Sequence, residues 1–392
     1  MNRQDIVVIA AQPWDIGIGS NCKNIALEFA KHHRVLYVNA PIDRSLIMRR
    51  AKEDWMVRRM EVINGDRPGL VQVEDSIWNL TPDFVAQSIN WIPVSFIHDA
   101  LNKRTNQQFA SSIKKAIDQL GFRDVVIFND SMMLRGFYLK ELLQPKRHIY
   151  YIRDYLVTQP YFKKQGKRLE PKLIAKSTTV VANSLFLTDY AKPFNDKSFY
   201  VGQGCETDLF SPDEIHPKPN EMLNVKGPII GYVGYLTSMR LSISLIAAIA
   251  KENKDWTVML VGPEDDDFRN SELHQIENII FTGPKDPSEL PTYVQHFDVC
   301  INPQAVNDLT IGNYPRKVDE YLAMGKPVVA TYTKTMEIFK DHCYLANGEH
   351  EYVDLIRKAL SENDDAKSKE RTRFAKTHTW EKSVEEIYKA AF

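Results

Sequence analysis

The chain has 392 residues, 43% hydrophobic and 26% charged, which is the profile of a globular protein long enough for two domains. Its 50 Lys and Arg residues balance 51 Asp and Glu residues, so no overall charge selects nucleic acid as a partner. The four cysteines show no CxxC spacing and no stretch reads as a signal peptide or a membrane span, so we expect a cytoplasmic protein without a disulfide framework or a zinc site.

Short β-branched runs alternate with helical stretches in the first half, a pattern typical of a parallel sheet covered by helices on both faces. Five strands are predicted, over 6–10, 35–38, 125–128, 148–152 and 179–182. After the first strand, Gly17 and Gly19 would let backbone N–H groups approach a diphosphate at the start of the next helix. The structural alternative is a tight turn with Ser20 or Asn21 as the helix cap.

The stretch 44–60 concentrates positive charge beside apolar side chains. It combines six basic residues with Leu, Ile, Met and Trp: Arg44, Arg49, Arg50, Lys52, Arg58 and Arg59. If exposed, it would contact the anionic inner face of a membrane peripherally. The alternative is that its apolar side chains pack under the first domain.

Arg153 and Asp154 follow the strand predicted at 148–152. Asp154 could hydrogen-bond a sugar hydroxyl or accept a proton in a reaction. It could equally pair with Arg153 or cap the next element.

A second set of strands is predicted over 229–233, 256–261, 279–281, 299–301 and 328–330, so the chain reads as two doubly wound domains. The proline-rich segment 211–220 is predicted to be a linker. We place the domains at 1–205 and 206–377. Such sheets bind ligands at the carboxyl ends of their strands, which predicts a site in a central cleft where the two sets of ends face one another.

The strongest candidate site segment is 313–329. Pro315 suits the start of a helix and Gly325 its end. Lys317 and Glu320 lie three residues apart and therefore share one helix face. Lys317 could contact a phosphate and Glu320 could accept hydrogen bonds from ribose hydroxyls, whereas a surface ion pair is the alternative. Asn313 opens this segment.

Upstream, Gly234 ends a strand and Arg240 follows at a predicted helix start, where a cation could neutralise a departing diphosphate. A solvated arginine is the alternative. The carboxylates of 264–267 include an Asp-x-Asp pattern that could hold a divalent metal. We interpret them as a solvated acidic loop and expect no metal.

From Gly231 to Val329, and more loosely over nearly the whole chain, the sequence resembles the retaining GT-B glycosyltransferases of family 4. The order of the elements carries the resemblance: the opening strand and glycine turn, the crossover at 201–210, the motifs at 261–263 and 278–283, and a terminal stretch at 380–388. It implies two Rossmann-like domains, with the donor nucleotide held by the second and a terminal helix, 378–392, packing back onto the first.

The family's donor motifs carry over unevenly. Arg240 stands in the place of its conserved lysine, and Lys317 matches its P-x-K-x-x-E variant. Glu320 is the second acid of its Glu-x7-Glu pair, implied to bind ribose, while the first acid is replaced by Gly312. Asp154 stands in the place of its catalytic-site histidine.

The resemblance implies a metal-independent, retaining hexosyltransferase without a cofactor, acting in the assembly of a cell-surface polysaccharide or glycolipid. The acceptor would be a sugar or a lipid-linked sugar. Two alternatives stay open: a nucleotide-sugar 2-epimerase, which needs more acid/base residues than Asp154, and a non-catalytic nucleotide-sugar-binding subunit, suggested by Gly312.

Overall fold

The computed structural model describes residues 3–15, 20–205 and 207–392. The chain divides into two compact units, residues 1–202 with 383–392, and residues 203–382. The backbone therefore leaves the first unit once and returns to it once. Residues 203–205, which the sequence analysis assigned to the first domain, belong to the second unit. So do residues 378–382, which it assigned to the terminal helix packing on the first domain.

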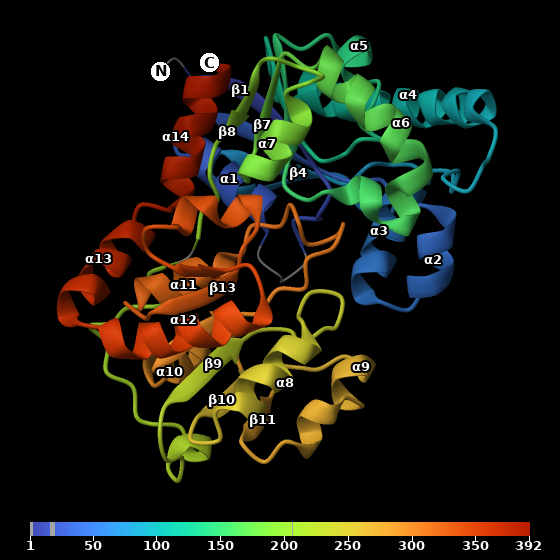
Figure 1. Ribbon diagram of the computed structural model, residues 1–392. Coiled ribbons are helices and arrows are strands. Elements are labelled where there is room, and N and C mark those ends of the chain that lie inside the picture. The colour runs from blue at the N-terminus through green and yellow to red at the C-terminus, as the bar shows by residue number, and fades with distance from the viewer. Residues whose placement is uncertain (1–2, 16–19, 206) are drawn as a thin grey trace. The chain divides into compact units, whose positions relative to one another are not determined.

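The first unit is built on an eight-stranded sheet in the order β3-β4-β2-β1-β5-β6-β7-β8 (Figure 1). All neighbours are parallel except β3 and β4. The five predicted strands are confirmed, and three more are present. The strands are β1 Asp5–Ala10, β2 Arg34–Asn39, β3 Leu70–Glu74, β4 Ile77–Leu80, β5 Val126–Asp130, β6 Arg147–Ile152, β7 Thr179–Ala182 and β8 Ser198–Tyr200.

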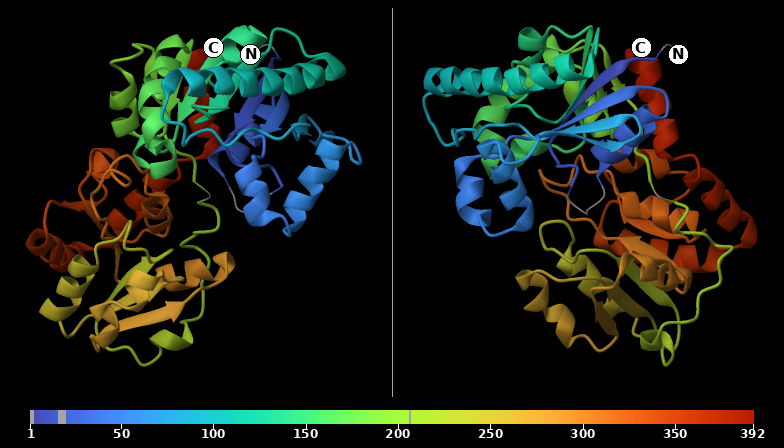
Figure 2. Two further views of the ribbon diagram at one scale, coloured as in Figure 1. Left: turned by 90° about the vertical axis from the view of Figure 1, so that its right-hand side faces the viewer. Right: turned by 180° about the vertical axis from the view of Figure 1, so that it is seen from behind.

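Helices cover this sheet, and two further helices lie together at one side of the unit (Figure 2). The pair is α2 Arg44–Arg50 and α3 Asp54–Asn64; the others are α1 Asn21–Ala30, α4 Ser95–Leu120, α5 Leu139–Leu143, α6 Pro160–Lys176, α7 Leu185–Ala191 and α14 Trp380–Ala391, with a 3-10 turn at Leu156–Thr158. Ser20 caps α1, because its side chain accepts from the Lys23 amide at 3.1 Å. Tyr388 of α14 packs against Phe29 of α1, so the end of the chain belongs to this core.

The second unit has a fully parallel six-stranded sheet in the order β11-β10-β9-β12-β13-β14. Its strands are β9 Ile229–Val233, β10 Thr257–Val261, β11 Ile279–Gly283, β12 Val299–Asn302, β13 Val328–Thr331 and β14 Tyr344–Ala346. Its helices are α8 Ile243–Glu252, α9 Asp266–Arg269, α10 Leu290–Gln295, α11 Arg316–Ala323, α12 Glu349–Glu362 and α13 Asp365–Ala375, with short 3-10 turns between them. The expected α/β class with two doubly wound sheets is confirmed.

The segment 211–220 is not a linker between the units. It lies inside the second unit, where the His216 amide donates to Gln295 Oε1 at 2.8 Å and Gln295 Nε2 donates to the Glu214 carbonyl at 2.6 Å. Its prolines produce an extended segment that packs on α10, so composition alone could not distinguish it from a free linker.

Candidate functional site

A pocket of about 400 Å³ lies within the second unit, at the carboxyl ends of β9 and β12 and beside the first turns of α11. Five residues singled out from the sequence line it: Gly234, Arg240, Asn313, Lys317 and Glu320. They come from two separate stretches of the chain, 234–240 and 313–320. The doubly wound topology brings them together, because it collects the loops that follow parallel strands at one edge of the sheet.

Lys317 lies in the first turn of α11, with its ammonium 5.4 Å from the ring centroid of Tyr232. Its side chain passes over Gly234, whose amide donates to the Val261 carbonyl at 2.8 Å. Among the described residues, no carboxylate lies within ion-pair distance of Lys317 or Arg240. Both cations therefore keep their charge available for an anion in the pocket.

Glu320 lies one turn after Lys317 and lines the same pocket. The predicted helix is confirmed, with Pro315 immediately before its first residue. Arg240 differs slightly from the expectation, because α8 begins at Ile243 and Arg240 lies in the preceding turn. Its amide donates to Thr237 and its carbonyl accepts from Ala305, so its backbone is held while its side chain is exposed.

Two lining residues were missed by the sequence reasoning. Asn302 ends β12 and is 5% exposed, and its Nδ2 has no hydrogen-bond partner among the described residues. Arg316, the first residue of α11, has a buried Nε that is likewise unpartnered in the described part of the chain. Buried donors are normally satisfied, so these two groups are candidate ligand contacts. The polar residue directly after the strand predicted at 299–301 was the available signal.

A buried hydrogen-bond network supports α11 from behind. The Asp319 carboxylate is fully buried, accepts from Cys205 Sγ at 3.1 Å and lies 2.6 Å from His378 Nδ1. The Cys205 amide also donates to the His378 carbonyl at 2.9 Å. The segments where the chain enters and leaves the second unit are thus both anchored on the helix that carries Lys317 and Glu320.

The candidate residues of the first unit that the structure describes do not line this pocket. Gly17 and Gly19 lie outside the described residues. Asp154 follows β6 and is partly exposed. Arg153 forms an ion pair with the fully buried Asp130, with Nε and Oδ1 2.9 Å apart, and Asp130 raises the pKa of this guanidinium. The main charge partner of Arg153 is therefore Asp130 rather than its neighbour Asp154.

Each carboxylate of the acidic loop 264–267 has a protein partner. Asp265 caps α9 by accepting from the Phe268 amide, and Asp267 accepts from Ser238 Oγ at 2.6 Å. Asp266 pairs with Arg269, and Glu264 lies 2.8 Å from His274 Nε2. Among the described residues, no group of three or more His, Cys, Asp or Glu side chains could hold a metal ion.

The basic stretch 44–60 forms α2 and α3. Met48 is 84% exposed, with Arg49 and Lys52 exposed nearby. Arg59, by contrast, is buried, where it pairs with Asp15 and donates to Thr81 Oγ1 at 2.5 Å. Fewer basic side chains of this stretch are therefore available to contact an anionic membrane than the sequence alone suggests. No helix in the described part of the chain is long and apolar enough to cross a membrane.

Residues 227–362, which contain every residue that lines this pocket, match the family described as Glycosyl transferases group 1. TuaH of Bacillus subtilis (strain 168), named as a teichuronic acid biosynthesis glycosyltransferase, is 30% identical over 238 residues. The match covers 57% of this chain and 59% of TuaH, so the chain spans about three fifths of that relative's length.

Two solved structures are similar over almost the full chain. Sucrose-phosphate synthase from Thermosynechococcus elongatus has a TM-score of 0.66 at 16% identity, covering 99% of this chain and 98% of that one. Anabaena HepE, described in complex with UDP and glucose, has a TM-score of 0.63 at 16% identity, covering 99% of each chain. This similarity concerns the fold and confirms the GT-B class with two Rossmann-like domains.

Proposed function

We propose that this chain, whose residues 227–362 form a glycosyl transferases group 1 domain, is a glycosyltransferase that moves a sugar from a nucleoside-diphosphate donor onto an acceptor. The observation that carries the proposal is the gathering of Gly234, Arg240, Asn313, Lys317 and Glu320 around one pocket. The description of HepE in complex with UDP and glucose makes UDP-glucose the first donor to test.

Cleavage of a sugar–diphosphate bond builds negative charge on the leaving phosphate. Lys317 and Arg240, together with the N-terminal amides of α11, would stabilise that charge. Glu320 would accept hydrogen bonds from the ribose hydroxyls and so orient the nucleotide. Because these side chains supply the positive charge, we propose a metal-independent reaction without a cofactor, and a retaining one as the resemblance implies.

Asp154 is proposed as the residue of the first unit that contacts the sugar or takes a proton. The acceptor would be a sugar or a lipid-linked sugar of a cell-surface polysaccharide or glycolipid, a proposal supported by the name of TuaH. The four cysteines are unpaired and buried, which supports a cytoplasmic location. We propose peripheral contact with the inner face of the membrane.

Incubation of the purified protein with a panel of nucleotide sugars tests this proposal. A transferase releases nucleoside diphosphate with transfer, or with slow hydrolysis when no acceptor is present. A 2-epimerase would instead convert the donor into its epimer. Binding without turnover over the whole panel would favour the non-catalytic subunit, which the glycine at position 312 suggests. Failure to bind any nucleotide would refute the assignment of the pocket.

A further inference from the structure

A second pocket, of about 170 Å³, lies wholly within the first unit. It is located beside the carboxyl ends of β1, β2 and β5, between residues 87–90, 131–135 and the start of α6. Its walls are mainly apolar and include Ile89, Met132, Met133, Leu134, Leu156 and Phe162. Such a lining suits hydrocarbon rather than a free sugar.

Three of the polar residues that line this pocket are engaged by the protein. Among the described residues that line it, Arg135 is the only charged one, and it is bound to the Asp43 carboxylate and to the Pro41 carbonyl. Asn102 Nδ2 donates to the Leu134 carbonyl at 3.1 Å, and Ser131 Oγ to the Tyr151 carbonyl at 3.0 Å. Asn90 Nδ2 is buried and has no hydrogen-bond partner among the described residues, so it remains for a polar atom of a ligand. A ligand rich in hydroxyl groups would find few other partners.

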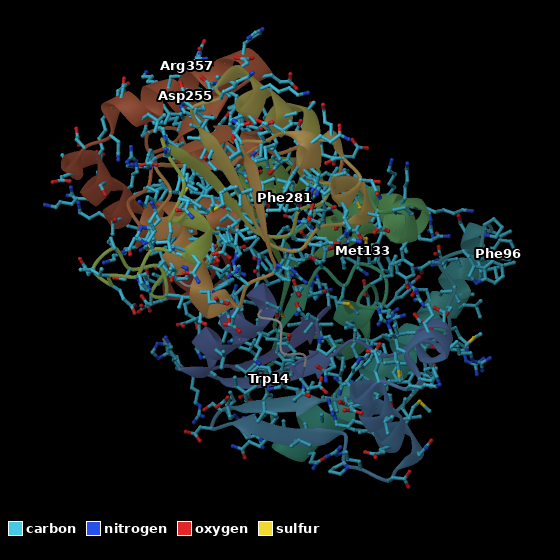
Figure 3. The ribbon with its side chains drawn as sticks, turned by 90° about the horizontal axis from the view of Figure 1, so that it is seen from below. Trp14, Phe96, Met133, Asp255, Phe281 and Arg357 are labelled. Atoms are coloured by element: carbon cyan, nitrogen blue, oxygen red, sulfur yellow. The ribbon has the colours of Figure 1, made fainter. Side chains whose placement is uncertain are left out.

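Three large aromatic side chains that face solvent lie on segments that border this pocket. Trp91 and Phe96 are each 75% exposed, and Tyr161, which also lines the pocket, is 53% exposed. Figure 3 shows Phe96 at the outer end of α4 and Met133 of the pocket wall deeper in the unit. Gln165 Nε2 of α6 donates to the Ile92 carbonyl at 2.9 Å, which joins the segment bearing Trp91 to the helix bearing Tyr161. Exposed aromatic residues gathered in this way mark an interaction surface.

The charge of α6 indicates the partner. Lys163, Lys164, Lys167 and Lys172 are exposed, and within the described residues none of them pairs with a carboxylate. The single acid of α6, Glu170, is buried. A surface of aromatic rings bordered by unpaired lysines is complementary to the headgroup region of an anionic bilayer.

We propose that the first-unit pocket binds the hydrocarbon chain of an acceptor lipid with an anionic head, and that Trp91, Phe96 and Tyr161 enter the bilayer that supplies it. The role as acceptor rests on the proposed glycosyltransferase function; lipid binding is measured independently of it. The membrane surface is then centred on residues 91–97 and α6. The start of α2 adjoins it, since the Ser45 amide donates to Ser88 Oγ at 3.3 Å.

Flotation of the full chain with phosphatidylglycerol vesicles tests the surface. The wild type should float at low salt and much less at high salt, because screening weakens the lysine contribution. The double variant Trp91→Ser/Phe96→Ser should stay at the bottom. A matched control, Ile215→Ser/Leu223→Ser, removes residues of the second unit that are 91% and 60% exposed and should float like the wild type. Failure of the wild type to float, or equal flotation of all variants, would overturn the proposed surface.

Calorimetry with monomeric dodecyl phosphate tests the pocket. The wild type should bind it, and Ala40→Phe, which fills the pocket, should weaken binding at least tenfold. Ala175→Phe adds the same side chain at an exposed position of α6 outside the lining and should not weaken it. Equal affinity in all three proteins, or binding of inorganic phosphate as strong as that of dodecyl phosphate, would refute a hydrocarbon site. UDP titration of the same samples reports folding and tests the donor site separately, so the two proposals can fail independently.

Discussion

Lys317 lies directly against Gly234, so that a Cβ atom placed on the glycine would be 2.0 Å from Lys317 Cε and 2.6 Å from its Nζ. The absence of a side chain at position 234 therefore creates the path by which the lysine reaches the donor pocket. We expect Gly234→Ala to displace Lys317 and to weaken UDP binding by about 1.4 kcal/mol, which is about tenfold. Isothermal calorimetry measures this effect.

Gly283→Ala is the control for backbone strain. Gly234 and Gly283 both have positive φ, 140° and 71°, but a Cβ on Gly283 would meet no atom within 4 Å. Both alanine variants should lose some stability through the backbone. Only the change at Gly234 should reduce UDP affinity, and an equal reduction in both variants would remove the steric explanation.

Glu320→Ala should weaken nucleotide affinity by roughly 1–3 kcal/mol while leaving the fold intact, because charge-assisted hydrogen bonds to the ribose would be lost. Glu277→Ala removes an exposed glutamate of the same unit outside the pocket and serves as the control. Comparison of UDP with 2′-deoxy-UDP refines the test. If the folded Glu320 variant binds UDP like the wild type, the ribose assignment is wrong.

Asp154→Asn should lower kcat by at least tenfold and leave UDP affinity unchanged, since Asp154 and the donor pocket belong to different units. Asp196→Asn, at an exposed position of the first unit, is the matched control. Steady-state kinetics with the best donor separates kcat from KM. Full activity in the Asp154 variant would leave the catalytic role to another residue.

Activity should survive chelation. The carboxylates of residues 264–267 are engaged in a helix cap, hydrogen bonds and ion pairs, and the proposed leaving group is stabilised by Lys317 and Arg240. We therefore expect equal transfer rates with and without EDTA. Loss of activity that Mn²⁺ or Mg²⁺ restores would contradict this, and Asp265 and Asp267 would then be the first residues to mutate.

Glu170 should make the stability of the protein depend on pH. Burial raises its pKa from 4.5 to about 7, although Tyr150 and Tyr190 donate hydrogen bonds to its carboxylate. Between these values the folded state binds more protons than the unfolded state. This contribution to the free energy of unfolding therefore falls as pH rises from about 4.5 to about 7, and is constant above.

The free energy of unfolding of the Glu170→Gln variant should not show this decrease with pH. At pH 8 it should be about 1–3 kcal/mol higher than that of the wild type. Denaturant titrations at several pH values measure the difference. Glu381→Gln, at an exposed position, should follow the wild type at every pH. Parallel curves for the wild type and the Glu170 variant would show that this carboxyl group is ionised in both states or in neither.

The central strands could be predicted from the sequence because both faces of these sheets are buried, so that β1, β5 and β9 are nearly continuous apolar runs. The edge strand β3 was missed, since its side chains are largely exposed and its sequence, Leu-Val-Gln-Val-Glu, carries only a weak pattern. The segment 211–220 was interpreted as a linker for a different reason. Its contacts include hydrogen bonds to Gln295, which is distant in the sequence, and such contacts produce no local sequence pattern.

The placement of Lys317 and Glu320 on one helix face could also be predicted from the sequence, because residues three apart in a helix share a face. The unpartnered Asn302, the pairing of Arg153 with Asp130 and the apolar pocket of the first unit were not evident. Each depends on residues that are far apart in the chain and adjacent in space. Spatial neighbours determine whether a polar group has a hydrogen-bond partner and whether an apolar side chain is exposed. Only the packing of the folded chain brings these neighbours together.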